Sequence, residues 1–376
     1  MSDPGAAKPV PNTPVFLPRQ SLQRLLDALV SSGWQLIGPL VRDGAVVFDP
    51  IDSVEELPRG IRDIQSPGRY RLEQTDSARL FGWANGPQAL KPITFAPEEV
   101  LWQVVLDGDG LHFESQPAVV PPTAVIGVRG CDLAALKLQQ AHFLQDGMAD
   151  PAFRRRLDSL FIVAVDCAHP AETCFCASTG DGPEAGEGYD IALTELDAGF
   201  LLRTGTPEGR GIVDSLALET ATAEQLQESD EASRRAVAAQ SRKLPGTDLR
   251  DALFASQEHP HWAAVAERCL ACGNCTAVCP SCFCSAYQPR PSLDGAESEQ
   301  VRMWDSCFSF EHSNLHGHPV RDDIRLRYRQ WLTHKLAGWH DQYGRSGCTG
   351  CGRCISWCPV GIDLTEEVAM LLEDSG

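Results

Sequence analysis

The chain has 376 residues, of which 22% are charged and 43% are hydrophobic, and its formal net charge at pH 7 is −19. Such an acidic chain is disfavoured as a nucleic-acid binder, because phosphates are negative as well. No apolar run approaches the roughly 20 residues of a membrane-spanning helix, and Met1–Gln20 contains no apolar secretory signal. We therefore expect a cytoplasmic protein without a membrane partner, in which fifteen cysteines indicate metal sites rather than disulfides.

The length favours two domains, and residues 1–250 show the pattern of an α/β domain. Apolar runs predict strands at Ala124–Val128 and Leu160–Val165. The first strand leads through Gly130 into a helix at Asp132–Phe143, for which Asp132 is the expected N-cap. A strand, a helix and a second strand in this order are typical of α/β folds.

The remaining elements of this domain are shorter or less regular. Local patterns predict an extended segment at Met1–Arg19, followed by a helix that Ser21 caps and that carries Leu22, Leu25, Leu26 and Leu29. A strand is expected at Ala45–Phe48 after a turn at Asp43-Gly44, and two strands are expected within Tyr189–Thr204 around a turn at Asp197–Gly199. Gly180–Gly188 is expected to be a loop and 214–243 a helical connection.

Two cysteine runs near the C-terminus have the spacing that bacterial ferredoxins use for [4Fe–4S] clusters. The runs are Cys269-x2-Cys272-x2-Cys275-x3-Cys279-Pro280 and Cys348-x2-Cys351-x2-Cys354-x3-Cys358-Pro359. Residues 251–376 are therefore expected to form a mainly helical, ferredoxin-like dicluster domain, which makes the whole chain an α+β protein. This domain is expected to contain a helix at about His261–Arg268 and a long insert at 280–347.

Each run can hold only part of one cluster. Three close cysteines on a loop reach three corners of a cubane, and in two-cluster ferredoxins the last cysteine of each run binds the other cluster. The expected ligands are Cys269, Cys272, Cys275 and Cys358 for the first cluster and Cys348, Cys351, Cys354 and Cys279 for the second. Zinc ribbons use separated CxxC pairs and disulfides need an oxidising compartment, so the spacing disfavours both alternatives.

A third group of cysteines lies in the first domain and comprises Cys131, Cys167, Cys174 and Cys176. The first two each follow a predicted strand, and ligand sites of α/β sheets collect at the carboxyl ends of strands. We therefore expect these four thiols to bind a third [4Fe–4S] cluster. Asp132, Asp166 and His169 are less favoured substitute ligands, and the alternative is a set of unrelated buried thiols.

Three further cysteines remain, namely Cys282, Cys284 and Cys307. They could bind a further cluster, but no fourth ligand is evident for it. We expect them instead to pack against the predicted clusters, where thiols and backbone groups tune the reduction potential.

The insert at 280–347 is longer than a link between two cluster loops requires. It carries residue types that are favoured at interfaces: Arg302, Trp304, Arg321, Arg325, Arg327 and Trp331. We expect the insert to cover the clusters and to form docking surface, and the alternative is an ordinary charged helix.

The cysteines belong to longer motifs that occur in a fixed order. These are Gly127-Val-Arg-Gly-Cys-Asp-Leu-Ala-Ala-Leu136, Cys167 followed by Cys174-Phe-Cys176-Ala-Ser, Cys279-Pro-Ser-Cys-Phe-Cys284, Met303-Trp-Asp-Ser-Cys307, His334-Lys335 and Gly350-Cys-Gly-Arg-Cys354. With them, the chain from about residue 120 to 365 resembles the iron–sulfur beta subunit of cytoplasmic NAD(P)-linked [NiFe] hydrogenases, also called sulfhydrogenases. It is also similar to the related electron-transfer component of anaerobic sulfite reductase. Gly130 departs from the proline of many relatives.

The resemblance implies an electron relay between a flavin/[2Fe–2S] subunit that reacts with NAD(P)H and the small and large subunits of a [NiFe] hydrogenase. The residues agree, because the chain has no GxGxxG after a strand and no catalytic His/Asp/Ser arrangement. Three alternatives stay open. They are an electron-transfer subunit of anaerobic sulfite reductase, a sulfur-compound reductase whose N-terminal cluster has an open coordination position, and a scaffold whose clusters only stabilise the fold.

Overall fold

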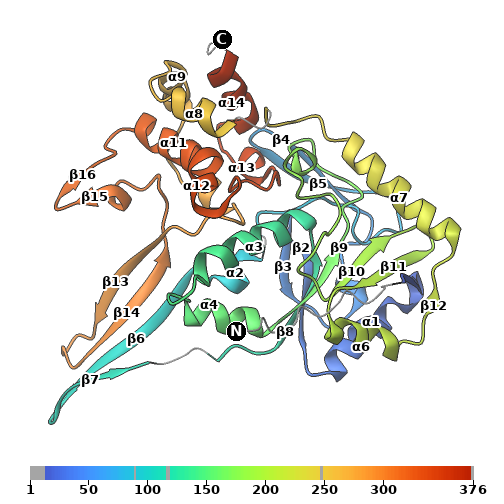
Figure 1. Cartoon of the computed structure of the whole chain (residues 1–376). Coiled ribbons are helices and arrows are strands. Elements are labelled where there is room, and N and C mark those ends of the chain that lie inside the picture. The colour runs from blue at the N-terminus through green and yellow to red at the C-terminus, as the bar shows by residue number, and fades with distance from the viewer. Residues whose placement is uncertain (1–12, 89, 116–118, 246–248, 374–376) are drawn as a thin grey trace, which may run out of the picture.

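The structure, a computed structural model, describes residues 13–88, 90–115, 119–245 and 249–373. Its largest element is an eight-stranded sheet with the strand order β12-β1-β11-β10-β9-β8-β2-β3 (Figure 1). The strands are β1 (Val15–Pro18), β2 (Gln35–Arg42), β3 (Ala45–Pro50), β8 (Thr123–Val128), β9 (Leu160–Val165), β10 (Ile191–Glu195), β11 (Gly199–Thr204) and β12 (Glu219–Thr220).

The centre of this sheet is parallel, as the α/β pattern predicts. β2, β8, β9 and β10 run in one direction. β3 pairs antiparallel with β2 and β11 antiparallel with β10, and β1 and β12 extend the sheet beyond β11 through further antiparallel pairs. The strands predicted at Ala124–Val128 and Leu160–Val165 are confirmed. Asp43 and Gly44 both adopt positive φ between β2 and β3, which a two-residue type I′ hairpin requires.

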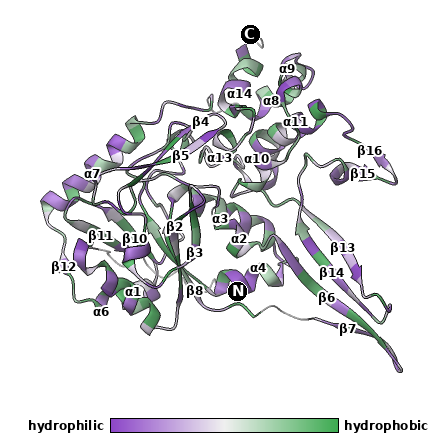
Figure 2. Ribbon diagram, turned by 180° about the vertical axis from the view of Figure 1, so that it is seen from behind, coloured by the Kyte–Doolittle hydropathy of each residue, from purple (hydrophilic) through white to green (hydrophobic). Residues whose placement is uncertain are grey.

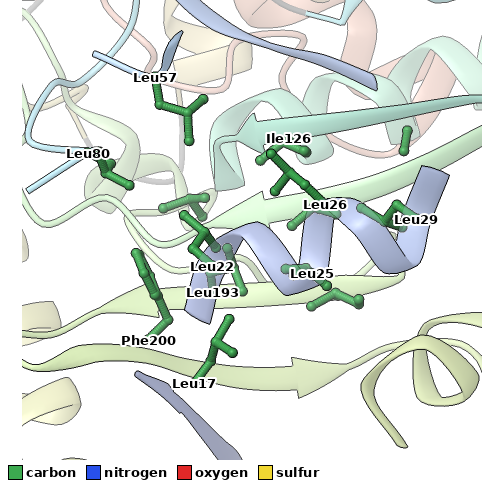
Figure 3. Packing of buried hydrophobic residues seen from close by; sticks show 14 of the residues in the cluster. Leu17, Leu22, Leu25, Leu26, Leu29, Leu57, Leu80, Ile126, Leu193 and Phe200 are labelled. Carbon is green, nitrogen blue, oxygen red and sulfur yellow. The ribbon is translucent and has the colours of Figure 1, made fainter. Parts of the chain in front are cut away.

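Helices cover both faces of the sheet: α1 (Leu22–Ser31) and α6 (Pro207–Ser215) lie on one, and α2 (Lys91–Thr94), α3 (Gly130–Phe143) and α4 (Pro151–Asp158) lie on the other. On the first face, Leu26 of α1 belongs to the same apolar core as Ile126 and Leu193 of the sheet (Figure 3). On the second face, Leu136 of α3 shares a core with Val125. Successive residues of β8 thus point to opposite faces.

Helix capping follows the sequence prediction only in part. Ser21 takes the N-cap position of α1, but its side chain makes no capping hydrogen bond. The prediction that Asp132 caps α3 is wrong, because this helix begins at Gly130 and Asp132 lies within its first turn. The Asp132 carboxylate accepts hydrogen bonds from Arg353 instead of from the helix N–H groups.

The less regular elements are largely as expected. β10 and β11 lie within Tyr189–Thr204, and 180–188 is a loop. The segment 214–243 is helical only in part, because β12 precedes the helix. Residues 1–12 of the predicted extended segment lie outside the described residues, and the following residues form β1. The smaller elements are α7 (Ala223–Ala238), α5 (Cys176–Thr179) and the hairpin of β4 (Ile61–Ser66) and β5 (Arg69–Gln74).

A four-stranded arm combines strands from the N-terminal and C-terminal halves of the sequence and projects from the body (Figures 1 and 2). Its order is β13-β14-β6-β7, and the strands are β6 (Glu98–Asp107), β7 (Gly110–Glu114), β13 (Ser285–Pro291) and β14 (Glu297–Trp304). The insert therefore pairs with a hairpin of the N-terminal half, which no local pattern indicates. Hydrophobic side chains on this arm are exposed, with Leu111 64% and Phe113 71% accessible.

The rest of the C-terminal part is mainly helical, and α9 has the predicted bounds. Its elements are α8 (Leu249–Ala255), α9 (His261–Arg268), α10 (Asn274–Ala277), β15 (Asn314–Leu315), β16 (His318–Pro319), α11 (Ile324–Thr333), a π-helical turn at His334–Gly338, α12 (Trp339–Tyr343), α13 (Arg353–Ser356) and α14 (Leu364–Glu373). Among the described residues, no helix has the length and apolar character needed to cross a bilayer.

Two residues of the predicted docking surface are buried. Arg302 is 4% exposed and pairs with Glu99 and Asp150, and Trp331 is 5% exposed in the core around α11. Arg302 joins the arm to the start of α4, and Trp331 packs inside the helical core, so neither side chain is available to a partner. Arg325, by contrast, is exposed.

Candidate metal centres

The third group of cysteines starts at the carboxyl edge of the sheet. β8 and β9 are parallel neighbours, with Val128 beside Ala164 at their ends. Cys131 lies in the first turn of α3, which follows β8, and Cys167 is the second residue after β9. The two strand ends therefore bring both cysteines to one edge, as the sequence predicts.

All four cysteines of this group lie close together. Burial raises the pKa of the Cys174 thiol, and the charges of Cys167 and Cys176 raise it further. Cys131 and Cys176 are buried and pack against Cys351 of the second run. The site is thus enclosed and lies next to the second predicted cluster, while ligation by these thiols stays a prediction.

The three substitute ligands are engaged elsewhere. Asp166 accepts hydrogen bonds from Arg203 (2.9 Å) and from the Thr194 hydroxyl (2.5 Å). Asp132 forms an ion pair with Arg353 at 2.6 Å. The His169 Nε2 atom lies 3.1 Å from Arg62 Nε. These contacts leave the four thiols as the donor set best suited to a cluster at this edge of the sheet.

The first run shares a cavity with the last cysteine of the second run. Cys269, Cys272, Cys275 and Cys358 line this cavity together with Cys354, and Phe308, Tyr328 and Trp331 contribute to its wall. This is the crossed set that the spacing predicts for the first cluster.

The second predicted set gathers in the same crossed manner. Burial raises the pKa of Cys354, and the charges of Cys348, Cys351 and Cys279 raise it further. Lys335, which is 4% exposed, donates to the Cys279 sulfur (3.4 Å). Burial alone would lower the pKa of this lysine, but the charges of Cys279, Cys282 and Cys348 outweigh that effect and raise it. A buried ammonium beside thiolates is suited to a centre of net negative charge.

Backbone N–H groups also point at the sulfur atoms of these loops. The Ala271 N–H donates to Cys269 Sγ (3.4 Å), the Gly350 N–H to Cys348 Sγ (3.5 Å) and the Ile362 N–H to Cys358 Sγ (3.3 Å). Hydrogen bonds of this kind tune the potential of iron–sulfur clusters. Four thiols per set, amide donors and a buried cation therefore fit [4Fe–4S] clusters.

A single metal ion fits less well. Across the described residues, no three His, Cys, Asp or Glu side chains converge closely enough to hold one ion. A cubane spreads its four thiolates over four iron atoms, so its ligands stand farther apart than those of one zinc ion. The wider grouping of the thiols favours clusters over mononuclear sites.

The loop of the second run packs tightly against the N-terminal cysteine loop. The Phe175 N–H donates to the Gly350 carbonyl oxygen (2.8 Å), and Asn85 Nδ2 donates to that of Cys351 (2.9 Å). A Cβ atom added to Gly350 would lie 2.5 Å from the Cys176 nitrogen. The backbone loops that carry the second and third predicted centres are therefore in direct contact.

The three remaining cysteines behave differently from one another. Cys282 is buried and hydrogen-bonds to Cys279, so it lies against a predicted cluster ligand. Cys284 hydrogen-bonds instead to Cys307 and to His312. This second contact brings a residue outside the sequence-predicted site into the neighbourhood of the clusters.

Sequence reasoning assigned no role to several other residues of the site. Lys335 and Arg353 both lie in the ordered motifs of the sequence, which is the signal that singled them out, but the motifs do not reveal their contacts. Gln240 Nε2 donates to Cys176 Sγ (3.3 Å), and Asn85 Nδ2 lies 3.8 Å from Cys174 Sγ. No pattern marked these two amides, because each is distant in sequence from the sulfur that it contacts.

Comparison with known proteins agrees with this geometry. Residues 268–362 match the 4Fe-4S dicluster domain family, and this range contains all eight cysteines of the two runs. The chain is 30% identical over 325 residues to the sulfhydrogenase 2 subunit beta of Pyrococcus furiosus, with 82% of this chain and 91% of the relative covered. No solved structure matches significantly. The chain therefore carries [4Fe–4S] clusters and belongs to the family of sulfhydrogenase beta subunits.

Proposed function

We propose that the chain is an electron-relay subunit that passes electrons through three [4Fe–4S] clusters. Its expected neighbours are a flavin/[2Fe–2S] subunit that reacts with NAD(P)H and the subunits of a [NiFe] hydrogenase, in a cytoplasmic complex. The name of its relative describes a subunit of a sulfhydrogenase, which supports assembly with other hydrogenase subunits.

One observation carries this proposal: each cysteine group is in contact with the next. Cys354 of the second set lines the cavity of the first set. Cys351 of the second set packs against Cys131 and Cys176 of the third. Short distances between successive centres are what a one-electron relay needs, and each cluster would exchange one electron when bound.

The two ends of this series differ in accessibility. Cys272 of the first set is exposed, and Leu270 beside it is 62% accessible. Cys131, Cys174 and Cys176 of the third set are buried. We therefore expect the first cluster to exchange electrons with one partner directly at a docking surface. The third cluster exchanges them with the other partner at its edge beside Cys167, which is only half-buried.

The test begins with iron analysis and redox titration of the anaerobically purified chain. We expect about twelve iron atoms per chain, since each cubane contains four, and three reversible one-electron signals. Co-purification with a nickel-containing chain supports the proposed complex. A sirohaem-containing partner, eight iron atoms, or clusters that stay redox-silent would contradict it.

A matched pair of variants tests the crossed ligands. Cys279→Ala should damage the cluster held by Cys348, Cys351 and Cys354, whereas Cys358→Ala should damage the other one. Mössbauer and electron paramagnetic resonance spectra distinguish the two losses. If each variant damages the cluster of its own run, the crossed assignment is wrong.

A further inference from the structure

Cys284 and Cys307 meet at the base of the hairpin formed by β13 and β14. Ser285 pairs with Trp304 in the strand register, and the Asp305 N–H donates to the Cys284 carbonyl oxygen (2.9 Å). The chain then turns, so that the Cys307 side chain reaches Cys284 and the two thiols share a hydrogen bond. The hairpin thus holds two cysteines in contact without using either as a ligand of the predicted clusters.

An imidazole and a carboxylate complete this pair. His312 hydrogen-bonds to the Cys284 sulfur, and its Nδ1 atom lies 2.5 Å from Asp305 Oδ2. The hydrogen bond from Cys307 lowers the pKa of Cys284, and burial partly opposes it. The contact with Cys284 raises the pKa of His312 to about 9. Because the imidazole of His312 contacts the Cys284 sulfur, we assign Cys284 as the nucleophilic thiolate. Cys307 is the thiol that donates to it, and Asp305 is the positioning residue that holds His312.

The pair lies beside a hollow that also reaches the first predicted cluster. This hollow, of about 240 Å³, is lined by Cys284, Cys282, Asp305, Lys91 and the cluster ligand Cys272. The charge of Cys275, another ligand of that cluster, acts on Cys307. Lys91 is held over the Trp304 ring at 3.9 Å and supplies a positive charge. A hollow with a thiolate, a cation and an adjacent redox centre suits a small anionic substrate.

A single metal ion does not explain the pair. Among the described residues, which include all of these side chains, no three His, Cys, Asp or Glu groups converge on one ion. Cys282, the nearest additional thiol, is hydrogen-bonded to Cys279 instead. Two cysteines in contact, one of them beside an imidazole, are what thiol–disulfide exchange requires.

We propose that Cys284 and Cys307 form a redox-active dithiol–disulfide couple that reduces a small organic disulfide in the hollow with electrons from the relay. This inference rests on the proposed relay function. The Cys284 thiolate attacks one sulfur of the substrate, a mixed disulfide forms, and the first thiol leaves with a proton from His312. Cys307 then gives its proton to His312 and attacks the Cys284 sulfur, which closes the Cys284–Cys307 disulfide. The second substrate sulfur leaves as a thiolate and takes that proton from His312.

The couple is restored by two electrons and two protons. The electrons arrive one at a time from the [4Fe–4S] relay, and the protons come from solvent, one of them through His312. The net reaction converts one disulfide, two electrons and two protons into two thiols. No further reductant is needed beyond the clusters that the family carries.

Trapping with cystine as the probe tests the couple in the full, cluster-loaded chain. After anaerobic exposure to cystine and alkylation of the remaining thiols, peptide mass spectrometry should find a Cys284–Cys307 disulfide in the unmodified protein. Cys307→Ser should instead retain a half-cystine on Cys284, and Cys284→Ser should retain none at Cys307. The control Tyr287→Phe, at an exposed residue of β13 outside the hollow, should still form the Cys284–Cys307 disulfide.

The number of electrons that each chain takes up is a second measurement, and a folding defect would not change it in the same way. After cystine treatment and its removal, a dithionite titration should consume two more electrons per unmodified chain than per Cys284→Ser/Cys307→Ser chain of equal iron content. Equal counts, or cystine adducts confined to other cysteines, would overturn the couple. Because the cluster signals are titrated in the same experiment, a failed relay would be seen separately as the loss of those signals.

Discussion

At the scale of single residues, the contact that joins the two parts of the chain most directly is a buried ion pair. Arg353 and Asp132 have side chains that are each 1% exposed, and they meet through two hydrogen bonds of 2.6 and 3.0 Å. Arg353 also donates to the carbonyl oxygens of Gly86 and Gln88. Since it lies between Cys351 and Cys354, it fixes the second cluster loop onto α3.

We expect Arg353→Met to destabilise the protein strongly. The change leaves the buried Asp132 carboxylate without its partner, and breaking a buried pair from one side costs about 3–5 kcal/mol. The double variant Arg353→Met/Asp132→Leu should regain most of the loss, because no charge is then left unpaired. Anaerobic thermal unfolding measures both.

Arg250→Met is the control for this prediction. Arg250 pairs with Asp341 at the surface, where both side chains are at least 40% exposed, so its loss should hardly move the unfolding midpoint. Equal shifts for Arg250→Met and Arg353→Met would show that the buried pair has no special role.

The same pair explains why one residue-level prediction failed. Asp132 has the residue type and position of a helix cap, but its partner is 221 positions away. Local patterns describe interactions between near neighbours, and this carboxylate is fixed by a distant one. Cysteine spacing was informative because the three thiols of one loop are near neighbours themselves.

At the scale of elements, the cluster loops and strand ends could be predicted but the arm could not. Cys131 and Cys167 follow β8 and β9, and parallel strands end at a common edge. The pairing of β14 with β6 joins segments about 200 residues apart. Pairing partners of antiparallel strands are selected by packing rather than by intrinsic propensity. The sequence of either segment therefore does not predict that it pairs with the other.

Gly350 is the position where contact between two loops is tightest, and Gly350→Ala should separate them. A Cβ there would lie 2.6 Å from the backbone carbonyl carbon of Phe175, which cannot move as a flexible side chain can. We expect altered spectra of the second and third clusters and faster amide exchange at Thr173–Cys176. The substitution should also cost more than the roughly 1–2 kcal/mol of free energy that a left-handed alanine costs by itself.

Gly344→Ala is the control, because it measures only the free-energy cost of placing an alanine at positive φ. Gly344 has a φ of +72°, close to the +65° of Gly350, but nothing lies within 4 Å of its added Cβ. This variant should lose stability without any change in cluster spectra. If both variants leave the spectra unchanged, the loop contact does not position the clusters.

At the scale of the whole molecule, the two parts are too interwoven to be tested separately by truncation. The arm shares strands between them, and the Cys351 loop contacts Asn85, Phe175 and Cys176. Removing the C-terminal part would expose β6 and the N-terminal thiols at once. Substitution of single cysteines within the intact complex is therefore the sharper test of the relay.

We expect all electron transfer between the first and third clusters to pass through the second cluster, because its cysteines lie between the accessible first set and the buried third set. In the assembled complex, Cys354→Ser should reduce hydrogen-dependent NAD(P) reduction at least tenfold, while dye-linked activities at each end persist. The physical reason is that a damaged middle centre leaves a gap too long for rapid electron transfer. Ile355→Val, one residue away in the same core, is the control, because it removes only one methylene for about 0.5–1.5 kcal/mol. Full coupled activity in Cys354→Ser, with its second cluster shown to be lost, would exclude the relay and favour a scaffold.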